Sequence, residues 1–356
     1  MRIKIITIAF ILAITCGRAQ AQQQFKDVDT WLNENTKNMG GRAILLVYQD
    51  GKIVYHHGVN SMTAKDRFMQ KLFAKKLDQP VDLNDYNLQS RQAIASCSKW
   101  LSAALVMTFV DQGSLKLSDT VGKYLPVLSQ HGKGAVTIAQ CLSHLTAIKA
   151  PPLGENPAEM KHIQSMSQAI QEIAALPMEG EPGEVFHYSY VGLQIAGAIL
   201  EKISGKSFET LFAERIARPL NMQHTDFGNE GLTLPAGGAF STPQDYLNFL
   251  VMILNKGTFN GKRILSEGSI AQMQMNRLTA DVKKIGFPAE ASGLGYGYGE
   301  WVMGSNSVSS PGLFGSNPWI DKQKKYAAFL MTLNMNRKGR QQRYQDLEKL
   351  VDNALR

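Results

Sequence analysis

Residues 100–110 form an uncharged, almost wholly apolar run that is too hydrophobic for a surface helix. A helix that is hydrophobic all round is buried, and Gly113 offers a suitable end for it. Lys99 stands directly before this run, and a lysine enters an apolar interior only when it is paired or loses its proton. Ser96 lies three residues earlier, so its hydroxyl and the amine share one helix face. The pattern predicts a serine nucleophile beside a lysine of lowered basicity, which can act as its base.

Tyr188 lies in a loop between the turn-rich residues 179–184 and a second apolar run that begins at Val191. A phenol ionises at about pH 10 in water, and a neighbouring ammonium group favours the phenolate. We therefore expect Tyr188 to face Lys99 and to serve as a base near neutral pH. The alternative is an ordinary core or rim tyrosine, which is the commoner role for this residue type in such a loop.

Residues 310–315, Ser-Pro-Gly-Leu-Phe-Gly, precede a short strand expected at residues 318–320. Taken alone, they form an ordinary turn. Placed beside the nucleophile, their backbone would provide an oxyanion donor, for which the N–H of Leu313 is the candidate. The start of the helix at Ser96 would add backbone N–H groups and the positive end of a helix dipole.

The remaining pattern has strand signals near both chain ends and helical periodicity between them. Asp50-Gly51 separates two apolar runs within residues 42–59, which predicts a hairpin. Residues 60–92 are polar without a clear period, so we expect a long loop or a small insertion. Helices are expected at residues 163–176 and 191–203, from Thr242 to Gly257, and at residues 340–355, and further strands at residues 296–303, 318–320 and 326–333.

Residues 1–21 have the three parts of a secretory leader. Basic residues stand near the start, an apolar run covers residues 5–14, and an Ala-Gln-Ala cleavage site precedes Gln22. The apolar run is too short to span a bilayer comfortably. We expect cleavage and a periplasmic or secreted protein without stable membrane insertion. A lipoprotein attached through Cys16 is the alternative, and the bulk of Thr15 disfavours it.

Composition excludes several other classes of protein. Loss of the three cations of the leader lowers the formal charge from +8 to +5, and the basic clusters at 322–325 and 337–343 match no nucleic-acid motif. No H-E-x-x-H motif is present, and residues 293–299 lack the dinucleotide spacing, so we expect neither metal nor cofactor. Cys97 and Cys141 are expected to be free core residues.

Four further sequence blocks follow the nucleophile in order along the chain. They are residues 115–126, 137–146, 219–225 and 236–245. Together with Ser96-x-x-Lys99, the Tyr188 segment and residues 310–315, they give the chain its resemblance to the serine β-lactamase-related family. That family contains class C β-lactamases, serine esterases of the same fold, D-amino-acid peptidases and DD-carboxypeptidases. The resemblance covers roughly residues 35–335, and the ordered blocks are more specific than any single motif.

The resemblance implies an α+β fold of the β-lactamase/transpeptidase-like type. Its antiparallel sheet is flanked by helices and built from both chain ends, and an all-α domain is inserted into it. The mature domain would cover residues 22–356. Its α/β part would comprise approximately residues 22–95 and 290–356, and its helical part approximately residues 96–289.

The resemblance also implies catalytic roles. Ser96 would attack a carbonyl carbon, and Lys99 and Tyr188 would activate it and pass its proton to the leaving group. The N–H groups of Ser96 and Leu313 would hold the oxyanion, and water would clear the acyl-enzyme. The expected partner is a small-molecule or peptide acyl substrate, with cell-wall fragments as one candidate, and no nucleic acid.

The chain departs from the family pattern at the expected substrate-binding residues, Tyr190, Ser310 and Gly312. Tyr190 replaces the usual asparagine, and Ser310 replaces a lysine or histidine, which removes a cation that would bind a substrate carboxylate. Ala147-Ile148 also replaces Ser-Gly. These changes favour an esterase or an amidase/peptidase over an efficient β-lactamase. A catalytically silent, penicillin-binding-like or peptidoglycan-associated protein is the alternative.

Overall fold

The computed structural model describes residues 24–151, 163–228 and 231–355. The chain forms two compact units, Met1–Asn87 with Leu330–Arg356, and Leu88–Phe329. The boundaries of these two units differ from those expected for the α/β part and the helical part. The division into those two parts stays a prediction. The expected leader at residues 1–21, with Cys16, lies outside the described residues.

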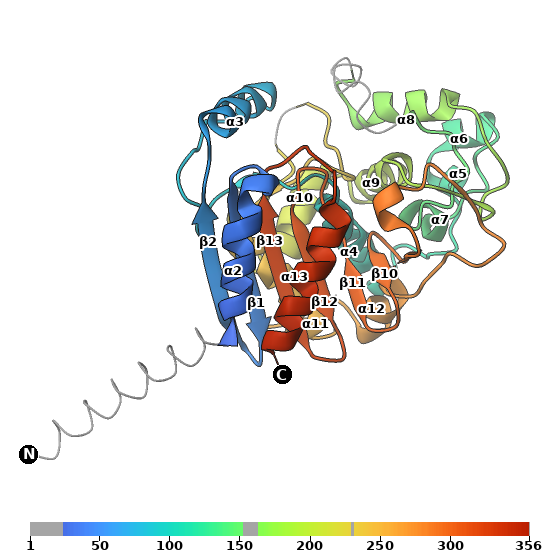
Figure 1. The fold of residues 1–356 in the computed structure, drawn as a ribbon. Coiled ribbons are helices and arrows are strands. Elements are labelled where there is room, and N and C mark those ends of the chain that lie inside the picture. Colours follow the sequence, from blue (N-terminus) through green and yellow to red (C-terminus); the bar gives the residue numbers. More distant parts are fainter. Residues whose placement is uncertain (1–23, 152–162, 229–230, 356) are drawn as a thin grey trace, which may run out of the picture. The chain divides into compact units, whose positions relative to one another are not determined.

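The first unit contains the predicted hairpin, formed by β1 (Arg42–Gln49) and β2 (Lys52–Asn60). Asp50 and Gly51 both have positive φ angles, 50° and 83°, as expected for a tight turn between twisted strands. Strand β1 is buried along most of its length and lies between β2 and β13 (Tyr326–Thr332), whose last residues belong to this unit. Helices α2 (Lys26–Asn35) and α13 (Arg340–Ala354) lie side by side next to these strands (Figure 1).

Of the two alternatives predicted for residues 60–92, a long loop is wrong for the first part, where α3 (Ala64–Lys76) forms. Thr63 and Asp66 make a capping box at its start, with each side chain bonded to the other residue's backbone N–H. Three of the large apolar side chains of α3, Phe68, Met69 and Leu72, are exposed, so the helix lacks the amphipathic pattern of one packed on a core. The capping residues Thr63 and Asp66 indicate the start of this helix in the sequence, whereas hydrophobic periodicity does not.

The second unit contains an antiparallel set of strands in the order β13-β12-β11-β10-β9. The strand expected at residues 296–303 is divided into β9 and β10, because Gly297 and Gly299 form a turn closed by a bond from Gly297 N–H to the Glu300 carbonyl. The short strand β11 escaped prediction because its three residues, Ser-Val-Ser, are too few to show a pattern. The bounds are β9 (Gly295–Tyr296), β10 (Trp301–Met303), β11 (Ser307–Ser309) and β12 (Asn317–Asp321).

Most helices of the second unit lie between residues 98 and 273, and short strand pairs join the loops around them. The predicted α4, α8, α9 and α11 are confirmed, and α9 ends at Gly205 with a φ of 69°. The helices are α4 (Ser98–Asp111), α5 (Val121–Tyr124), α6 (Pro126–Gln130), α7 (Ile138–Leu142), α8 (Met166–Ala175), α9 (Val191–Ser204), α10 (Phe208–Phe212), α11 (Pro243–Leu254) and α12 (Glu267–Met273). The short strands are β3 (Gln92–Ala93), β4 (Val185–His187), β5 (Phe240–Ser241), β6 (Thr258–Phe259), β7 (Lys262–Arg263) and β8 (Lys283–Ile285).

Helices and an antiparallel sheet thus occur together, which confirms the predicted α+β class. Cys97 and Cys141 are free and buried, as expected. No helix within the described ranges combines the length and the apolarity that a membrane crossing requires.

Candidate active site

Ser96 lies on a tight turn directly before a buried helix. The turn is the 3-10 segment η2 (Ala95–Cys97), and α4 follows without a break. Ala95 has a φ of 46°, a left-handed conformation that is strained for a residue with a side chain and is often found at functional sites. Helix α4 is buried around its circumference, as its composition predicts. The hydroxyl of Ser96 is thereby presented at the positive end of the helix dipole.

Lys99 brings its amine to Ser96 inside this interior. The side chain is almost completely buried, and Nζ donates to Ser96 Oγ at 3.1 Å and to the Ala236 carbonyl at 2.7 Å. Burial penalises the charged ammonium and lowers the pKa of Lys99 to about 7. The amine therefore exists in substantial part without its extra proton at neutral pH, as a base requires.

The Ala236 carbonyl is a part of the site that the sequence did not reveal. A neutral amine has two N–H groups and one lone pair. When one N–H is given to the Ala236 carbonyl, the lone pair is free to face the Ser96 hydroxyl. The family usually has an asparagine at position 190 to hold the lysine, and here a backbone oxygen does so. In the sequence, residues 236–245 indicated only a resemblance to the family. Their contact with Lys99 could not be predicted, because any residue can supply a backbone carbonyl.

Tyr188 also lies near the nucleophile, since the Ser96 side chain acts on its phenol as a hydrogen-bonding group that lowers the pKa. Its ring lies 4.7 Å from Lys99 Nζ and stacks on Trp301 with the ring centroids 5.2 Å apart. Burial raises the pKa of Tyr188 well above the usual value for a phenol. The expectation that Tyr188 ionises near neutral pH is therefore not met. Desolvation is the largest influence on this pKa, and it outweighs the lowering contribution of the Ser96 side chain.

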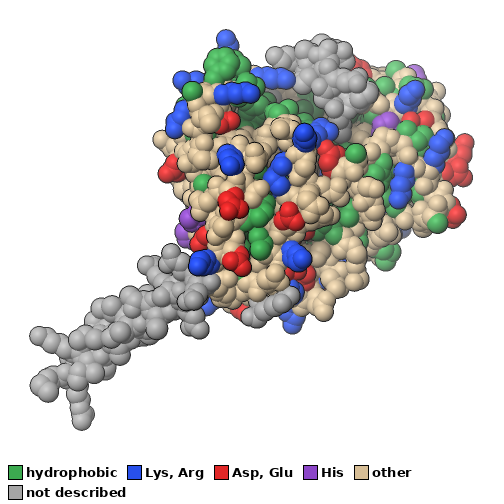
Figure 2. Space-filling model, in the orientation of Figure 1, with side chains coloured by type: hydrophobic (Ala, Val, Ile, Leu, Met, Phe, Trp, Pro, Cys, Tyr) green, Lys and Arg blue, Asp and Glu red, His purple; other side chains and the backbone are tan. Residues whose placement is uncertain are grey.

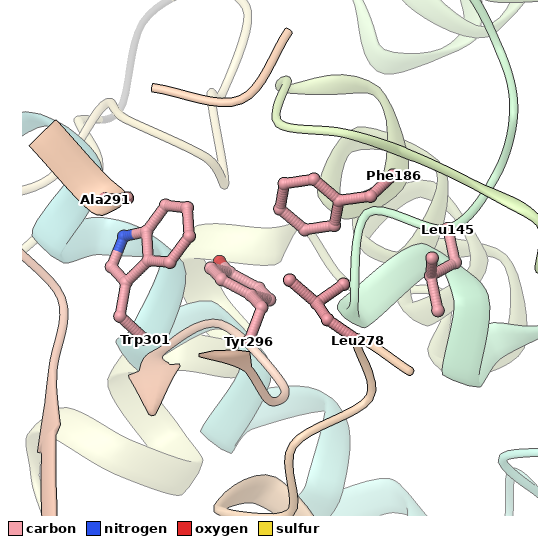
Figure 3. Packing of buried hydrophobic residues seen from close by; sticks show 6 residues of the cluster. All are labelled: Leu145, Phe186, Leu278, Ala291, Tyr296 and Trp301. Atoms are coloured by element: carbon pink, nitrogen blue, oxygen red, sulfur yellow. The ribbon is translucent and has the colours of Figure 1, made fainter. Parts of the chain in front are cut away.

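An aromatic cluster holds Tyr188 from the side away from the nucleophile. Tyr296 meets Trp301 edge-on at 4.7 Å and Phe186 at 5.6 Å, and Figure 3 shows the Tyr296 ring between the side chains of Trp301 and Leu278. Leu145 and Ala291 complete the buried cluster, against which Tyr188 packs. Rings in contact have few alternative rotamers, so Tyr188 is held firmly in place.

His144 supports the same cluster as an uncharged residue. Burial, with a smaller contribution from Lys99, holds the pKa of His144 well below its usual value. Its Nδ1 accepts from the Ser189 N–H at 3.4 Å, so the proton resides on Nε2, which lies 3.0 Å from the Tyr296 hydroxyl. His144 thus joins the loop that carries Tyr188 to the aromatic cluster.

Residues 310–315 lie against the nucleophile turn, as predicted. The Ser310 hydroxyl donates to the Gly299 carbonyl at 3.0 Å, and the Ser96 carbonyl lies 3.3 Å away. A Cβ atom at Gly312 would lie 2.4 Å from the Ile94 carbonyl oxygen, so only glycine allows this approach. Ser310 therefore positions the turn. Its contact with a substrate, and the roles of Gly312 and Leu313 there, stay predictions.

Tyr190 takes no part in holding Lys99. It is the half-buried N-cap of α9, and its carbonyl accepts from the Gln194 N–H at 3.0 Å. Burial, followed by the charge of Glu172, raises the pKa of the Tyr190 phenol. Whether Tyr190 contacts a substrate stays a prediction.

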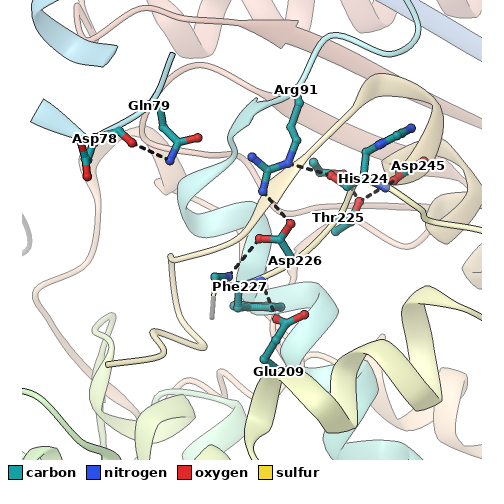
Figure 4. Close-up of polar contacts among 11 residues, drawn as sticks. Asp78, Gln79, Arg91, Glu209, His224, Thr225, Asp226, Phe227 and Asp245 are labelled. Atoms are coloured by element: carbon teal, nitrogen blue, oxygen red, sulfur yellow. Dashed lines mark hydrogen bonds and ion pairs between the residues drawn. The ribbon is translucent and has the colours of Figure 1, made fainter. Parts of the chain in front are cut away.

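A second polar network in this unit is structural. Arg91 pairs with Asp226 at 2.6 Å, and Glu209 accepts from the Phe227 N–H at 2.7 Å (Figure 4). Burial raises the pKa of Glu209 to about 7. These bonds tie Asp226 and Phe227 to Arg91 and to Glu209 of α10. Within the described ranges no group of three His, Cys, Asp or Glu side chains is arranged to hold a metal ion.

The Beta-lactamase family model matches residues 33–353. The chain belongs to this family. A putative β-lactamase from Bacteroides dorei has the same fold, with a TM-score of 0.77 and 25% identity over 93% of this chain and 98% of that one. A family VIII carboxylesterase of 19% identity shares the fold, with a TM-score of 0.71 over 94% of this chain and 96% of its own.

Among curated relatives, the D-alanyl-D-alanine-carboxypeptidase/endopeptidase AmpH of Escherichia coli is 24% identical over 252 residues. The match covers 64% of this chain and 64% of AmpH. The chain therefore spans a little under two thirds of that relative. Family membership gives the fold of the chain.

Proposed function

We propose that this protein is a serine hydrolase that forms an acyl-enzyme on Ser96. Its substrates would be small esters or amides, including peptides, and it would be an inefficient β-lactamase. The observation that carries the proposal is the amine of Lys99, buried, of lowered pKa, and 3.1 Å from the Ser96 hydroxyl. A hydroxyl is a weak nucleophile until a base removes its proton, and this geometry supplies the base.

In the proposed acylation, Ser96 Oγ bonds to the substrate carbonyl carbon as its proton passes to the lone pair of Lys99. The resulting ammonium is held by the Ala236 carbonyl at 2.7 Å. Tyr188 keeps its proton at neutral pH because of its raised pKa, so it acts as the acid. It donates that proton to the departing oxygen or nitrogen and regains one from Lys99. Water then attacks the acyl-enzyme by the reverse proton transfers and frees Ser96.

The oxyanion of the tetrahedral intermediate would be held by the backbone N–H groups of Ser96 and Leu313. Two observations support this assignment. Ser96 lies at the start of α4, where the helix dipole favours negative charge. Gly312, next to Leu313, approaches the backbone of the nucleophile turn more closely than a side chain would permit. A donor fixed in this way needs no rearrangement when charge develops.

The substrate class follows from the missing cation at position 310. A lysine or histidine there would bind a carboxylate through a charge-assisted hydrogen bond. The Ser310 hydroxyl instead bonds to the Gly299 carbonyl. β-Lactams and peptides ending in D-alanine both carry a carboxylate, so we propose less anionic acyl substrates, with neutral cell-wall fragments as one candidate. Export through the leader at residues 1–21 is part of the same proposal.

A fluorophosphonate probe tests the reaction class. We expect the intact mass of the protein to increase by one phosphonyl group, and the Ser96→Ala variant to remain unlabelled. The Tyr188→Phe variant keeps the ring but loses the acid, so its labelling rate should fall by about 10²-fold or more. The control Tyr48→Phe, which removes a hydroxyl from a partly buried tyrosine on β1, should label like the wild type. A folded wild-type protein that takes no label would indicate the silent binding protein instead.

Substrate preference is tested by comparing kcat/KM for p-nitrophenyl esters, D-amino-acid amides and nitrocefin. We expect turnover of the short esters or amides to exceed nitrocefin turnover by about 10- to 150-fold, since losing a charge-assisted contact costs about 1.5–3 kcal/mol. Comparable nitrocefin turnover would contradict the argument from Ser310.

A further inference from the structure

Exposed apolar side chains are concentrated on one short helix. Four of the six large hydrophobic residues that are exposed in the described part of the chain lie within residues 68–81. Three of them are on α3, where Phe68 is 60% exposed, Met69 51% and Leu72 46%. Single exposed apolar residues need no explanation, but a cluster of them indicates an interaction surface.

These three side chains share the outward face of α3. Leu72 lies four residues after Phe68 and three after Met69, so all three project from one side of the helix. The opposite side is fixed by Gln70, which is buried, accepts from Arg42 Nη2 at 2.5 Å and donates to the Gly40 carbonyl at 3.1 Å. The anchor keeps the apolar face turned toward solvent, and Figure 2 shows apolar side chains together with basic ones at the position of α3 in Figure 1.

The charge on α3 is strongly one-sided. Its single acidic residue, Asp66, is occupied in the capping box with Thr63. The helix also carries five basic residues, all of them exposed, namely Lys65, Arg67, Lys71, Lys75 and Lys76. A helix with an apolar strip and basic flanks has the composition of a membrane-surface helix.

We propose that α3 binds the surface of a membrane rich in anionic phospholipid, with Phe68, Met69 and Leu72 at the boundary between headgroups and acyl chains. The basic side chains would contact the phosphates. A second copy of the chain fits this surface less well, because a contact between two such faces would bring their cations together. The proposal is independent of the chemistry at Ser96, and it concerns attachment to one leaflet.

The test is co-sedimentation of the full chain with vesicles containing about 30% phosphatidylglycerol in phosphatidylcholine, at about 0.1 M salt. Variants share the wild-type N-terminus, so any contribution from residues 1–21 cancels. Each cation near an anionic surface strengthens binding about fivefold, so Lys71→Gln/Lys75→Gln should weaken binding about 25-fold. Phe68→Ser/Leu72→Ser should weaken it at least tenfold, about the loss for one buried apolar side chain. The control Lys202→Gln/Lys349→Gln, which removes two exposed lysines elsewhere, should change it less than about twofold.

Weakened binding in both α3 variants, with little binding to pure phosphatidylcholine, would support the proposal. Equal binding of the wild type and the Phe68→Ser/Leu72→Ser variant would overturn it. A second outcome would also overturn it: the wild-type protein does not bind vesicles but self-associates in sedimentation, and the Phe68→Ser/Leu72→Ser variant does not self-associate. In that case α3 would be an interface between copies of the chain. Because both substitutions are on exposed side chains, circular dichroism should show an unchanged fold.

Discussion

At the scale of single residues, burial moves the pKa values of Lys99 and Tyr188 in opposite directions. Removing water disfavours the charged form of each group, which is the protonated amine in one case and the ionised phenol in the other. The pKa of Lys99 falls to about 7, and that of Tyr188 is raised. One physical cause thus supports the separate roles that we propose for these neighbouring groups, base for Lys99 and acid for Tyr188.

The pH dependence of kcat/KM should show this division. Lys99 accepts the Ser96 proton only when uncharged, so kcat/KM for a neutral ester should rise about tenfold per pH unit below about 7 and level off above it. No falling limb from Tyr188 is expected below pH 10, because its pKa is raised. The measurement is a pH profile with a short p-nitrophenyl ester. The control Tyr48→Phe, on β1, should give the same profile. A rate that is flat across neutral pH would contradict Lys99 as the base.

At the scale of elements, the site depends on backbone segments that approach one another at glycine positions. Gly312 brings the 310–315 segment to the Ile94 carbonyl, and Gly299 brings the β9–β10 turn to the carbonyl of Lys99, where a Cβ atom would lie 2.5 Å from the oxygen. Each contact joins α4 or its leading turn to a distant part of the unit. The nucleophile turn is therefore held by its neighbours, which can maintain the strained φ of Ala95.

Substitution of these glycines tests that dependence. Gly312→Ala places a methyl group 2.4 Å from a backbone oxygen, so the free energy of unfolding should fall by about 1–3 kcal/mol and acylation should slow. Gly237→Ala is the matched control, since a Cβ atom there meets nothing within 4 Å. Urea unfolding and fluorophosphonate labelling rates measure the two effects. Equal stability of the two variants would show that the close approach does not constrain the turn.

At the scale of the whole molecule, the Leu88–Phe329 unit buries polar groups that weaken its stability. Glu300 is completely buried, and neither carboxyl oxygen has a hydrogen-bond partner within the described residues. Burial raises the pKa of Glu300 well above its usual value. The Glu300 carboxyl group is therefore protonated in the folded protein at neutral pH. It ionises when the chain unfolds, and this ionisation stabilises the unfolded state.

Glu300→Gln should remove this effect. The unfolded glutamate releases its proton above about pH 4.3 while the folded one keeps it, so this contribution lowers stability as the pH rises. The variant should be more stable than the wild type by about 1–3 kcal/mol at pH 7 and show little gain at pH 4. Urea unfolding at both pH values measures the difference. The exposed Glu181→Gln serves as the control, and an equal gain at both pH values would exclude ionisation as the cause.

Spacing and turn chemistry along the chain determined the buried helix α4, the pairing of Ser96 with Lys99, the β1–β2 hairpin and the end of α9. Each depends on atoms within a few residues of one another, so local geometry suffices. Tertiary structure alone decided that the Ala236 carbonyl holds Lys99, from 137 positions along the chain. It also decided that the Tyr188 phenol stays protonated and that α3 turns its apolar face outward. These outcomes depend on which distant groups exclude water from a given atom, and packing settles that only when the whole chain has folded.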